Sequence, residues 1–297
     1  MIQVQNLTKR YGATTAIEDV SFTVPKGQVV GFLGPNGAGK STTMRIIAGS
    51  LGATEGQVLL DGQDVFKHPR EVKRRIGYLP EVPPLYTDMT VRDYIRFAAR
   101  IKGVEDTRGA TEAAISKTGL TPVAHRIVDH LSKGYRQRCG LAQALVHSPE
   151  VLILDEPYSG LDPAQRVEIR VLLQSLLEDD HTIVLSTHVL ADIEALAKRV
   201  VIINEGRIVA QDDIAHLGQD SQTVELQLAR PEGALEVLRA LPEVLTAQQI
   251  DRDRFRLQTR DDQRATLAAA AVPFGLLELQ GRQRLEDLFL RLTGDHS

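Results

Sequence analysis

The segment that most restricts how this chain can fold is a glycine-rich loop between an apolar run and a helical one, Gly34-Pro35-Asn36-Gly37-Ala38-Gly39-Lys40-Ser41. Glycines at this spacing let the backbone curve so that successive amides point inward, and the following helix directs its positive end to the same place. Such a loop binds phosphate groups. We expect residues 34 to 41, with Thr42 at the start of the helix, to bind a nucleotide, with Lys40 on its β and γ phosphates and Ser41 on Mg²⁺. A chance glycine-rich turn is the alternative.

Short β-branched runs recur along the chain and are typical of buried strands: Val29–Leu33, Val151–Leu154, Thr182–Thr187 and Val200–Asn204. Helical patterns lie between these runs, for example over Ala164–Leu177. This alternation predicts parallel strands joined by crossover helices. The core around the phosphate-binding loop is therefore expected to be an α/β fold.

The segments beside this core have different patterns. Ile2–Leu7, Val20–Val24 and Val58–Leu60 are bounded by turn residues and suit an antiparallel sheet next to the core. Between about Pro83 and Ser148 the apolar spacing becomes helical. The sequence therefore predicts an antiparallel β subdomain and an inserted helical subdomain at residues 83–148.

After Gly218 the pattern changes again, to four strand-like and two helix-like segments in the order β-α-β-β-α-β. These are Thr223–Leu228, Pro231–Ala240, Val244–Ile250, Arg254–Thr259, Asp261–Ala271 and Leu276–Gln280. The order fits a small ferredoxin-like α+β domain, closed by an amphipathic helix over Leu285–Leu292. A chain of 297 residues has room for both parts, and we predict domains at residues 1–218 and 219–297.

Charge and apolar patterning restrict the kinds of partner that the protein is expected to bind and the cellular compartment in which it is expected to lie. The net charge of -4 argues against a nucleic-acid-binding protein, because neutralising phosphates calls for a basic surface. A basic cluster between residues 70 and 75 is interpreted as the solvated face of a short helix. Met1–Leu7 lacks the pattern of a signal peptide, and the longest apolar stretch, Leu267–Leu277, is shorter than the roughly 20 residues that span a membrane. These features predict a cytoplasmic protein, with the lone Cys139 in its core.

A second chemical motif is the apolar run from Val151 that ends in two carboxylates, Asp155 and Glu156. Alone, this is a common transition from a strand to a loop. Beside a phosphate-binding loop, Asp155 is expected to be a second contact to Mg²⁺. Glu156 is expected to be the base that polarises an attacking water.

Upstream of these carboxylates lies Leu131-Ser132-Lys133-Gly134-Tyr135-Arg136-Gln137, just before a helical run. With the two motifs above, this segment resembles the signature loop of the ATP-binding-cassette (ABC) superfamily. The resemblance implies that Ser132 and Gly134 cap the γ-phosphate held by an opposing subunit. Lys133 and Tyr135 depart from the family pattern, and a simple helix cap is the alternative interpretation.

Four further residues take their roles from the resemblance. Asp162, in Ser159-Gly160-Leu161-Asp162, resembles the key residue of the loop between subunits, although a type I turn explains this segment nearly as well. His188, after Ser186-Thr187, resembles the switch histidine that contacts the γ-phosphate. Tyr11 resembles the aromatic residue that stacks on adenine, or is an ordinary strand-end tyrosine. Glu81 stands where the family has a glutamine that contacts Mg²⁺.

The resemblance implies the function as well. The motifs, with the ending over residues 284–294, are similar to those of bacterial drug-resistance and gliding-motility subunits, which are mostly exporters. Such a chain binds ATP and Mg²⁺, pairs with a second copy or a paralogue, and hydrolyses ATP to drive a separate membrane permease. It is then peripheral on the inner face of the membrane through that permease. The alternative is a soluble ABC ATPase acting on ribosomes or DNA, a class that usually carries two cassettes or coiled-coil insertions.

Overall fold

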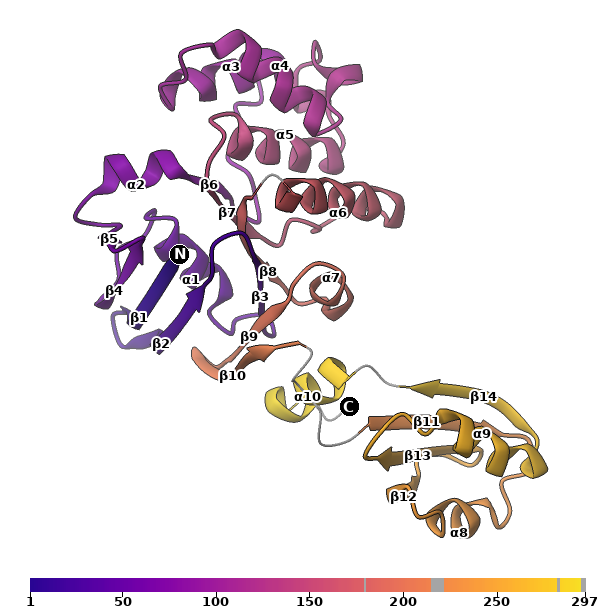
Figure 1. Ribbon diagram of the computed structural model, residues 1–297. Coiled ribbons are helices and arrows are strands. Elements are labelled where there is room, and N and C mark those ends of the chain that lie inside the picture. The colour runs from indigo at the N-terminus through magenta and orange to yellow at the C-terminus, as the bar shows by residue number, and fades with distance from the viewer. Residues whose placement is uncertain (179, 215–221, 282–283, 295–297) are drawn as a thin grey trace. The chain divides into compact units, whose positions relative to one another are not determined.

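The computed structural model describes residues 1–178, 180–214, 222–281 and 284–294 (Figure 1). The chain forms two compact units, Met1–Gln211 and Asp212–Ser297. Gly218, where the sequence predicted the domain boundary, lies outside the described residues.

A six-stranded sheet with the order β10-β9-β3-β8-β7-β6 forms the centre of the first unit. Its strands are β3 (Val29–Leu33), β6 (Ile76–Leu79), β7 (Val151–Asp155), β8 (Thr182–Thr187), β9 (Arg199–Asn204) and β10 (Arg207–Asp213). The pairs β9/β3, β3/β8, β8/β7 and β7/β6 are parallel. Every residue of β3, β7 and β8 is buried, which explains their nearly continuous apolar sequences. The α/β class is confirmed.

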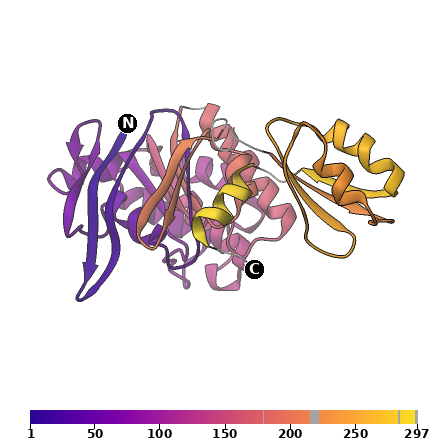
Figure 2. The ribbon, with the colours of Figure 1, turned by 90° about the horizontal axis from the view of Figure 1, so that it is seen from below.

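An antiparallel sheet with the order β2-β1-β4-β5 lies along one edge of this unit, where Figure 2 shows it in indigo and purple. It consists of β1 (Ile2–Tyr11), β2 (Thr14–Val24), β4 (Glu55–Leu60) and β5 (Gln63–Asp64). One hydrophobic core joins the two sheets through α1 (Lys40–Ile47). In this core the ring centroids of Phe22 and Phe32 are 5.3 Å apart. The helix after the glycine-rich loop is thus held between two sheets.

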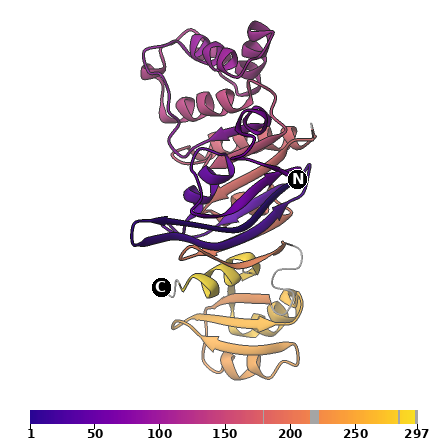
Figure 3. The same cartoon turned by 90° about the vertical axis from the view of Figure 1, so that its left-hand side faces the viewer.

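The remaining helices of the unit form two groups. Three of them, α3 (Val91–Ile101), α4 (Thr107–Lys117) and α5 (Lys133–Leu145), gather at one end around their own core (Figure 3). Cys139 is buried in that core, and burial raises the pKa of its thiol to about 12. The 3-10 turns Thr121–Val123 and Val128–His130 contribute Val123 and Val128 to the same core, and the other helices of the unit are α2 (Pro69–Arg75), α6 (Pro163–Glu178) and α7 (Leu190–Glu194).

The second unit contains an antiparallel sheet with the order β12-β13-β11-β14. Along the chain the elements are β11 (Gln222–Leu228), α8 (Ala234–Arg239), β12 (Val244–Gln249), β13 (Arg254–Thr259), α9 (Arg264–Ala271), the 3-10 turn Val272–Phe274, β14 (Leu276–Gly281) and α10 (Arg284–Thr293). Phe255, Leu257 and Leu267 lie in a core that joins the sheet to α8 and α9. The chain order β-α-β-β-α-β gives this unit the topology of a split βαβ fold.

Among the described residues, no helix is both long enough and apolar enough to cross a membrane.

Candidate active site

The glycine-rich loop connects β3 to α1, and Gly39 is the last of its residues before the helix begins. Gly39 has φ +104°, and a Cβ at this position would lie 2.6 Å from Cγ2 of Ile17 and 2.9 Å from the carbonyl oxygen of Ala16. Both the dihedral angle and the close approach require glycine here. The helix begins at Lys40, and the Thr43 amide donates to the Gly39 carbonyl at 3.0 Å. The loop therefore directs the amino end of α1 toward the space that it encloses.

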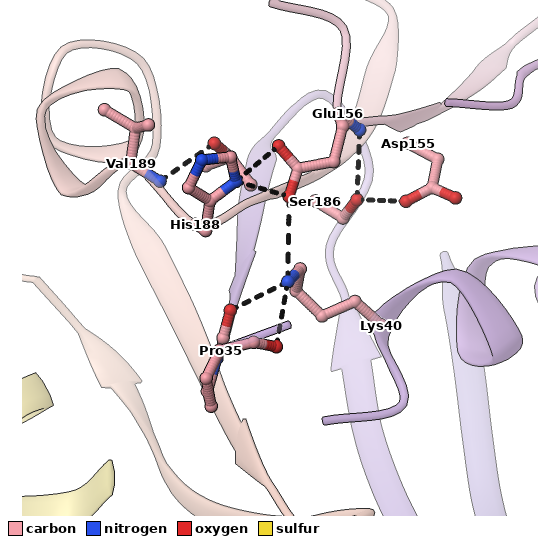
Figure 4. A network of polar contacts seen from close by, with 9 residues as sticks. Pro35, Lys40, Asp155, Glu156, Ser186, His188 and Val189 are labelled. Carbon is pink, nitrogen blue, oxygen red and sulfur yellow. Dashed lines mark hydrogen bonds and ion pairs between the residues drawn. The ribbon is translucent and has the colours of Figure 1, made fainter. Parts of the chain in front are cut away.

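Lys40 is buried, with 6% of its surface exposed. Its Nζ donates to the carbonyl oxygens of Gly34 at 2.8 Å and Pro35 at 3.1 Å, and lies 3.6 Å from Oε1 of Glu156 (Figure 4). A buried ammonium group is costly unless it is paired. Here the loop carbonyls and one carboxylate stabilise it beside the loop, where a phosphate can replace the carboxylate.

A cavity of about 420 Å³ opens beside this loop. Residues of several separate segments line it: Ala16, Asn36, Gly37, Gly39, Lys40, Ser41, Thr42, Glu81, Glu156, Ser159 and His188. These segments meet because β3, β8, β7 and β6 are consecutive in the sheet, so that their carboxyl ends lie at one edge. The cavity therefore contains predicted residues from both chemical motifs together with Glu81 and His188.

Asp155 ends β7 and is almost completely buried. Burial raises the pKa of its carboxyl group, while hydrogen bonds from the hydroxyls of Ser186 and Ser41 lower it and the nearby charge of Glu81 raises it. Ser41, Asp155 and Glu81 thus provide a hydroxyl and two carboxylates near one another. These are the oxygen donors that Mg²⁺ takes in nucleotide sites.

Glu156 follows directly and is 7% exposed. Nδ1 of His188 lies 3.0 Å from both of its carboxylate oxygens (Figure 4), so the tautomer protonated at Nδ1 donates to Glu156. The Glu156 backbone has φ +48° and its amide donates to the Ser186 carbonyl at 3.1 Å. A left-handed backbone at a non-glycine residue is uncommon and is often found at functional sites. Glu156 therefore lies between Lys40 and His188, and its Oε1 is close to both of them.

The signature-like segment and the segment ending at Asp162 contact each other, and of the two only the second reaches the cavity lining of the described residues, through Ser159. Ser132 caps α5, accepting from the Tyr135 amide at 3.4 Å, and Asp162 accepts from the Gln165 amide at 2.8 Å at the start of α6. A Cβ on Gly134 would lie 2.3 Å from Oε1 of Gln165. Gln165, which the sequence did not single out, thus joins the two segments, while Ser132, Gly134 and Asp162 lie outside the cavity lining that the described residues form.

Tyr11 is also outside this cavity lining, as far as the described residues define it. It ends β1, is 47% exposed, and has Nζ of Lys9 5.2 Å from its ring centroid. Three further residues that had no predicted role lie at the cavity or bond its carboxylates: Ala16, Ser159 and Ser186. The last two stand inside motifs that the sequence did identify.

Known proteins resemble this chain in sequence. The ABC transporter family profile matches residues 17–159. The bacitracin transport ATP-binding protein BcrA of Bacillus licheniformis is 34% identical over 99% of this chain and 97% of its own length. The linearmycin resistance ATP-binding protein LnrL of Bacillus subtilis is 32% identical over 99% and 98%.

This chain belongs to the ABC transporter ATP-binding family.

Solved structures agree with this membership. The ATP-binding subunit of an ABC transporter has 30% identity and a TM-score of 0.67, covering 73% of this chain and 91% of its own. A dimeric ABC cassette in a post-hydrolysis state with ADP and Pi has 25% identity and the same TM-score, covering 72% and 98%. The chain is an ATP-binding subunit of an ABC transporter and an ATPase, as its motifs predicted, and it has the nucleotide-binding fold of that family.

Proposed function

We propose that this chain hydrolyses ATP in the cavity beside the glycine-rich loop and uses the energy to drive export by a separate permease. The single observation that carries the assignment is that the buried Glu156 carboxylate contacts both Lys40 and His188. A cation, a carboxylate and an imidazole that share a cavity of about 420 Å³ provide charge stabilisation and a base. The relatives named for bacitracin transport and linearmycin resistance support export over action on ribosomes or DNA.

In this proposal the residues of the cavity have separate roles. The backbone of residues 34 to 42 and Nζ of Lys40 bind the phosphates, so that Lys40 exchanges the Glu156 carboxylate for a phosphate oxygen. Glu156 then accepts a hydrogen bond from the attacking water and polarises it. His188, oriented by Glu156, contacts the γ-phosphate. The contribution of the protein is mainly positioning and charge stabilisation.

Mg²⁺ fits the oxygen donors at the inner end of the cavity. Ser41, Asp155 and Glu81 would hold the ion, and the influence of both Ser41 and Glu81 on the pKa of the Asp155 carboxyl supports this grouping. When bound, Mg²⁺ neutralises charge on the β and γ phosphates. Glu81 adds a negative charge beside the phosphates where the family has a neutral glutamine.

A second ATPase subunit would complete each site. Ser132 and Gly134 lie at the amino end of α5, away from the cavity of their own subunit but suited to a phosphate presented from outside. Asp162 lies beside them through Gln165. The dimeric cassettes among the structural relatives support pairing with another copy or a paralogue.

An apolar groove supports the permease as a further partner. The loop that lines the cavity at Glu81 continues to Pro84 and Tyr86, which border a groove of about 450 Å³ together with Tyr94 and Phe97 of α3. The Tyr86 ring is 54% exposed. An amphipathic segment from the cytoplasmic side of a permease fits this groove, and would place the chain on the inner face of the membrane. Residues 1–218 would form the motor and residues 219–297 an accessory domain.

Nucleotide occupancy tests the proposal. In the purified chain at millimolar Mg-ATP, we expect bound nucleotide in the parental protein and a loss of at least about tenfold in affinity in Lys40→Ala, since a charge-assisted contact to phosphate is worth about 1.5–3 kcal/mol. Lys67→Ala is the matched control, because the Lys67 side chain is 75% exposed and outside the cavity lining of the described residues. A folded parental chain that binds no nucleotide contradicts the proposal.

A further inference from the structure

A group of charged and polar side chains is buried close to the cavity and has no role in the chemistry described above. Asp192 of α7 is 2% exposed, and Nη2 of Arg170 in α6 donates to its Oδ1 at 3.3 Å. Tyr158, also 2% exposed, lies near this pair in the segment just after Glu156, and burial and then the negative charge of Asp192 raise the pKa of its hydroxyl. The group therefore joins α6, α7 and the segment that carries the proposed base.

This ion pair is incompletely satisfied. Oδ2 of Asp192 and Nε of Arg170 are buried and have no hydrogen-bond partner among the described residues. A buried polar atom left unpaired costs about 1–3 kcal/mol. Burial raises the pKa of the Asp192 carboxyl, and the positive charges of Arg166 and Arg170 lower it. An ion pair with a carboxylate buried at such a cost contributes little to the stability of the fold. A specific structural role therefore explains the pair better.

The geometry of α7 indicates what that role is. With five residues, α7 is too short to be stable alone, so tertiary contacts must determine its position. On one side Ile193 packs against β3, where a Cβ on Gly31 would lie 2.5 Å from its Cδ1. On the other side Asp192 pairs with Arg170 of α6. Both contacts together hold α7 between the sheet and α6.

His188 is two residues before the start of α7. Its side chain is 52% exposed, and it contacts Glu156 through Nδ1. Packing therefore restrains the imidazole weakly, and its direction depends on how the backbone enters α7. The Val189 amide donates to Oγ1 of Thr187 at 3.0 Å, which restrains the same turn. A shift of α7 would be transmitted to His188 over less than one helical turn.

We propose that Asp192, through its ion pair with Arg170, is a positioning residue that holds His188 against Glu156 for ATP hydrolysis. This inference rests on the proposed roles of Glu156 and His188. Asp192 itself lies outside the cavity lining of the described residues and touches no reacting group. Its effect is therefore expected on the chemical step and not on the binding of the nucleotide.

The first test is a double-mutant cycle in the purified full chain. Asp192→Asn keeps the shape and removes the charge, and we expect kcat for ATP hydrolysis to fall about 10- to 100-fold, the scale of a small misplacement, with KM for ATP unchanged within about twofold. In a His188→Ala background the same substitution should change kcat by less than about twofold, because the two residues act together. Full additivity in the cycle overturns the proposal.

Glu112→Gln is the matched control, since it also removes one carboxylate from an arginine pair, but on the exposed surface of α3 and α4. It should leave kcat unchanged. If Asp192→Asn fails to fold, Arg170→Gln removes the same ion pair from the partly exposed partner. A folded Arg170→Gln protein with parental kcat overturns the proposal as well.

A second readout does not require hydrolysis. The imidazole resonances of His188, assigned from the spectrum of His188→Gln, should move in Asp192→Asn toward their position in Glu156→Gln, whereas those of the exposed His125 should not. Unchanged His188 resonances overturn the positioning role. A parental chain that binds ATP without hydrolysing it contradicts the proposed function instead, and the spectra still decide the present inference.

Discussion

The two units bury different kinds of side chain. Among the described residues, the first unit buries the charged groups of Lys40, Asp155, Glu156 and Asp192, whereas the polar residues buried in the second are threonines. Burying a charge costs several kcal/mol unless partners stabilise it. In the first unit two of these charged groups, Lys40 and Glu156, line the cavity, whereas the core of the second unit consists of apolar side chains.

The two units also differ in how many of their non-glycine residues have a positive φ. All non-glycine residues described with positive φ lie in the first unit, from Asn6 to Glu205, and Glu156 is one of them. In the second unit the described positive-φ residues are glycines, which take this conformation without strain. Buried charged groups and non-glycine residues with positive φ, both of which cost free energy, thus occur together in the unit that binds ATP. Four substitutions test whether this contrast between chemistry and packing is correct.

Glu156→Gln should have the largest effect. It removes the proposed base while keeping its size, and we expect kcat to fall about 10²- to 10⁴-fold with ATP binding intact and stable dimers formed. Steady-state kinetics, nucleotide titration and size-exclusion chromatography measure these three outcomes. Glu236→Gln, on the exposed face of α8, is the control in the other unit. A Glu156→Gln protein that turns over ATP at the parental rate would remove the base assignment.

Phe255→Ala should have the next largest effect, on stability and not on catalysis. Phe255 is completely buried in the core of the second unit, and truncating such a side chain costs about 3–5 kcal/mol. Denaturant unfolding should show this loss while the affinity for ATP changes by less than about twofold. Loss of ATP binding in a protein that remains folded would mean that the units are not independent in function.

His147 should give the first unit a dependence of stability on pH. Burial, together with the charge of Lys102, lowers the pKa of this imidazole to about 4 from 6.5. Between these values the unfolded chain binds a proton that the folded chain does not, so the free energy of unfolding falls as the pH decreases through this window. We expect a loss on the order of 2 kcal/mol, less than the full shift because the side chain is partly exposed.

Denaturant unfolding at several pH values measures this loss. His147→Gln should flatten the dependence and His125→Gln, at an exposed position, should not. An unchanged pH dependence in His147→Gln would assign the acid sensitivity instead to carboxylates whose pKa is lowered in the folded chain, such as Glu150 beside Arg75 and Glu112 beside Arg92.

Tyr11→Ala should have the smallest effect. If the ring stacks on adenine when ATP binds, KM for ATP should rise by a factor corresponding to about 1 kcal/mol, with kcat unchanged. Tyr11→Phe keeps the flat apolar face and should bind ATP like the parental chain. Equal KM values in all three proteins would favour the strand-end alternative, which agrees with the position of Tyr11 outside the cavity lining of the described residues.

The strands that were predicted well are those with an unbroken apolar sequence. β3 and β8 begin and end where the sequence indicated, because both faces of these strands are buried. β6 was missed, since it has four residues with Gly77 among them and lies at the edge of the sheet. β1 and β2 extend further than predicted because their pairing with each other continues through exposed polar residues up to Tyr11 and Thr14.

The candidate site shows a similar division. Lys40, Glu156 and His188 were identified because large functional groups stand in motifs of fixed spacing. Ala16 and Gln165 were missed, since a methyl group and an amide acquire their roles only from neighbours that are distant in the sequence. No local pattern of residues contains that information.

The order of strands in the parallel sheet has a consequence for synthesis of the protein. β3 and β7, which precede the phosphate-binding loop and the carboxylates, are separated in the sheet by β8, which comes later in the chain than either. A nascent chain that has emerged only as far as Ser159 has the lysine and both carboxylates but not the strand that brings them together. ATP can therefore favour folding on the ribosome only after Thr187 has left the exit tunnel, and until then the apolar edges of β3 and β7 remain open to wrong pairing or to chaperones.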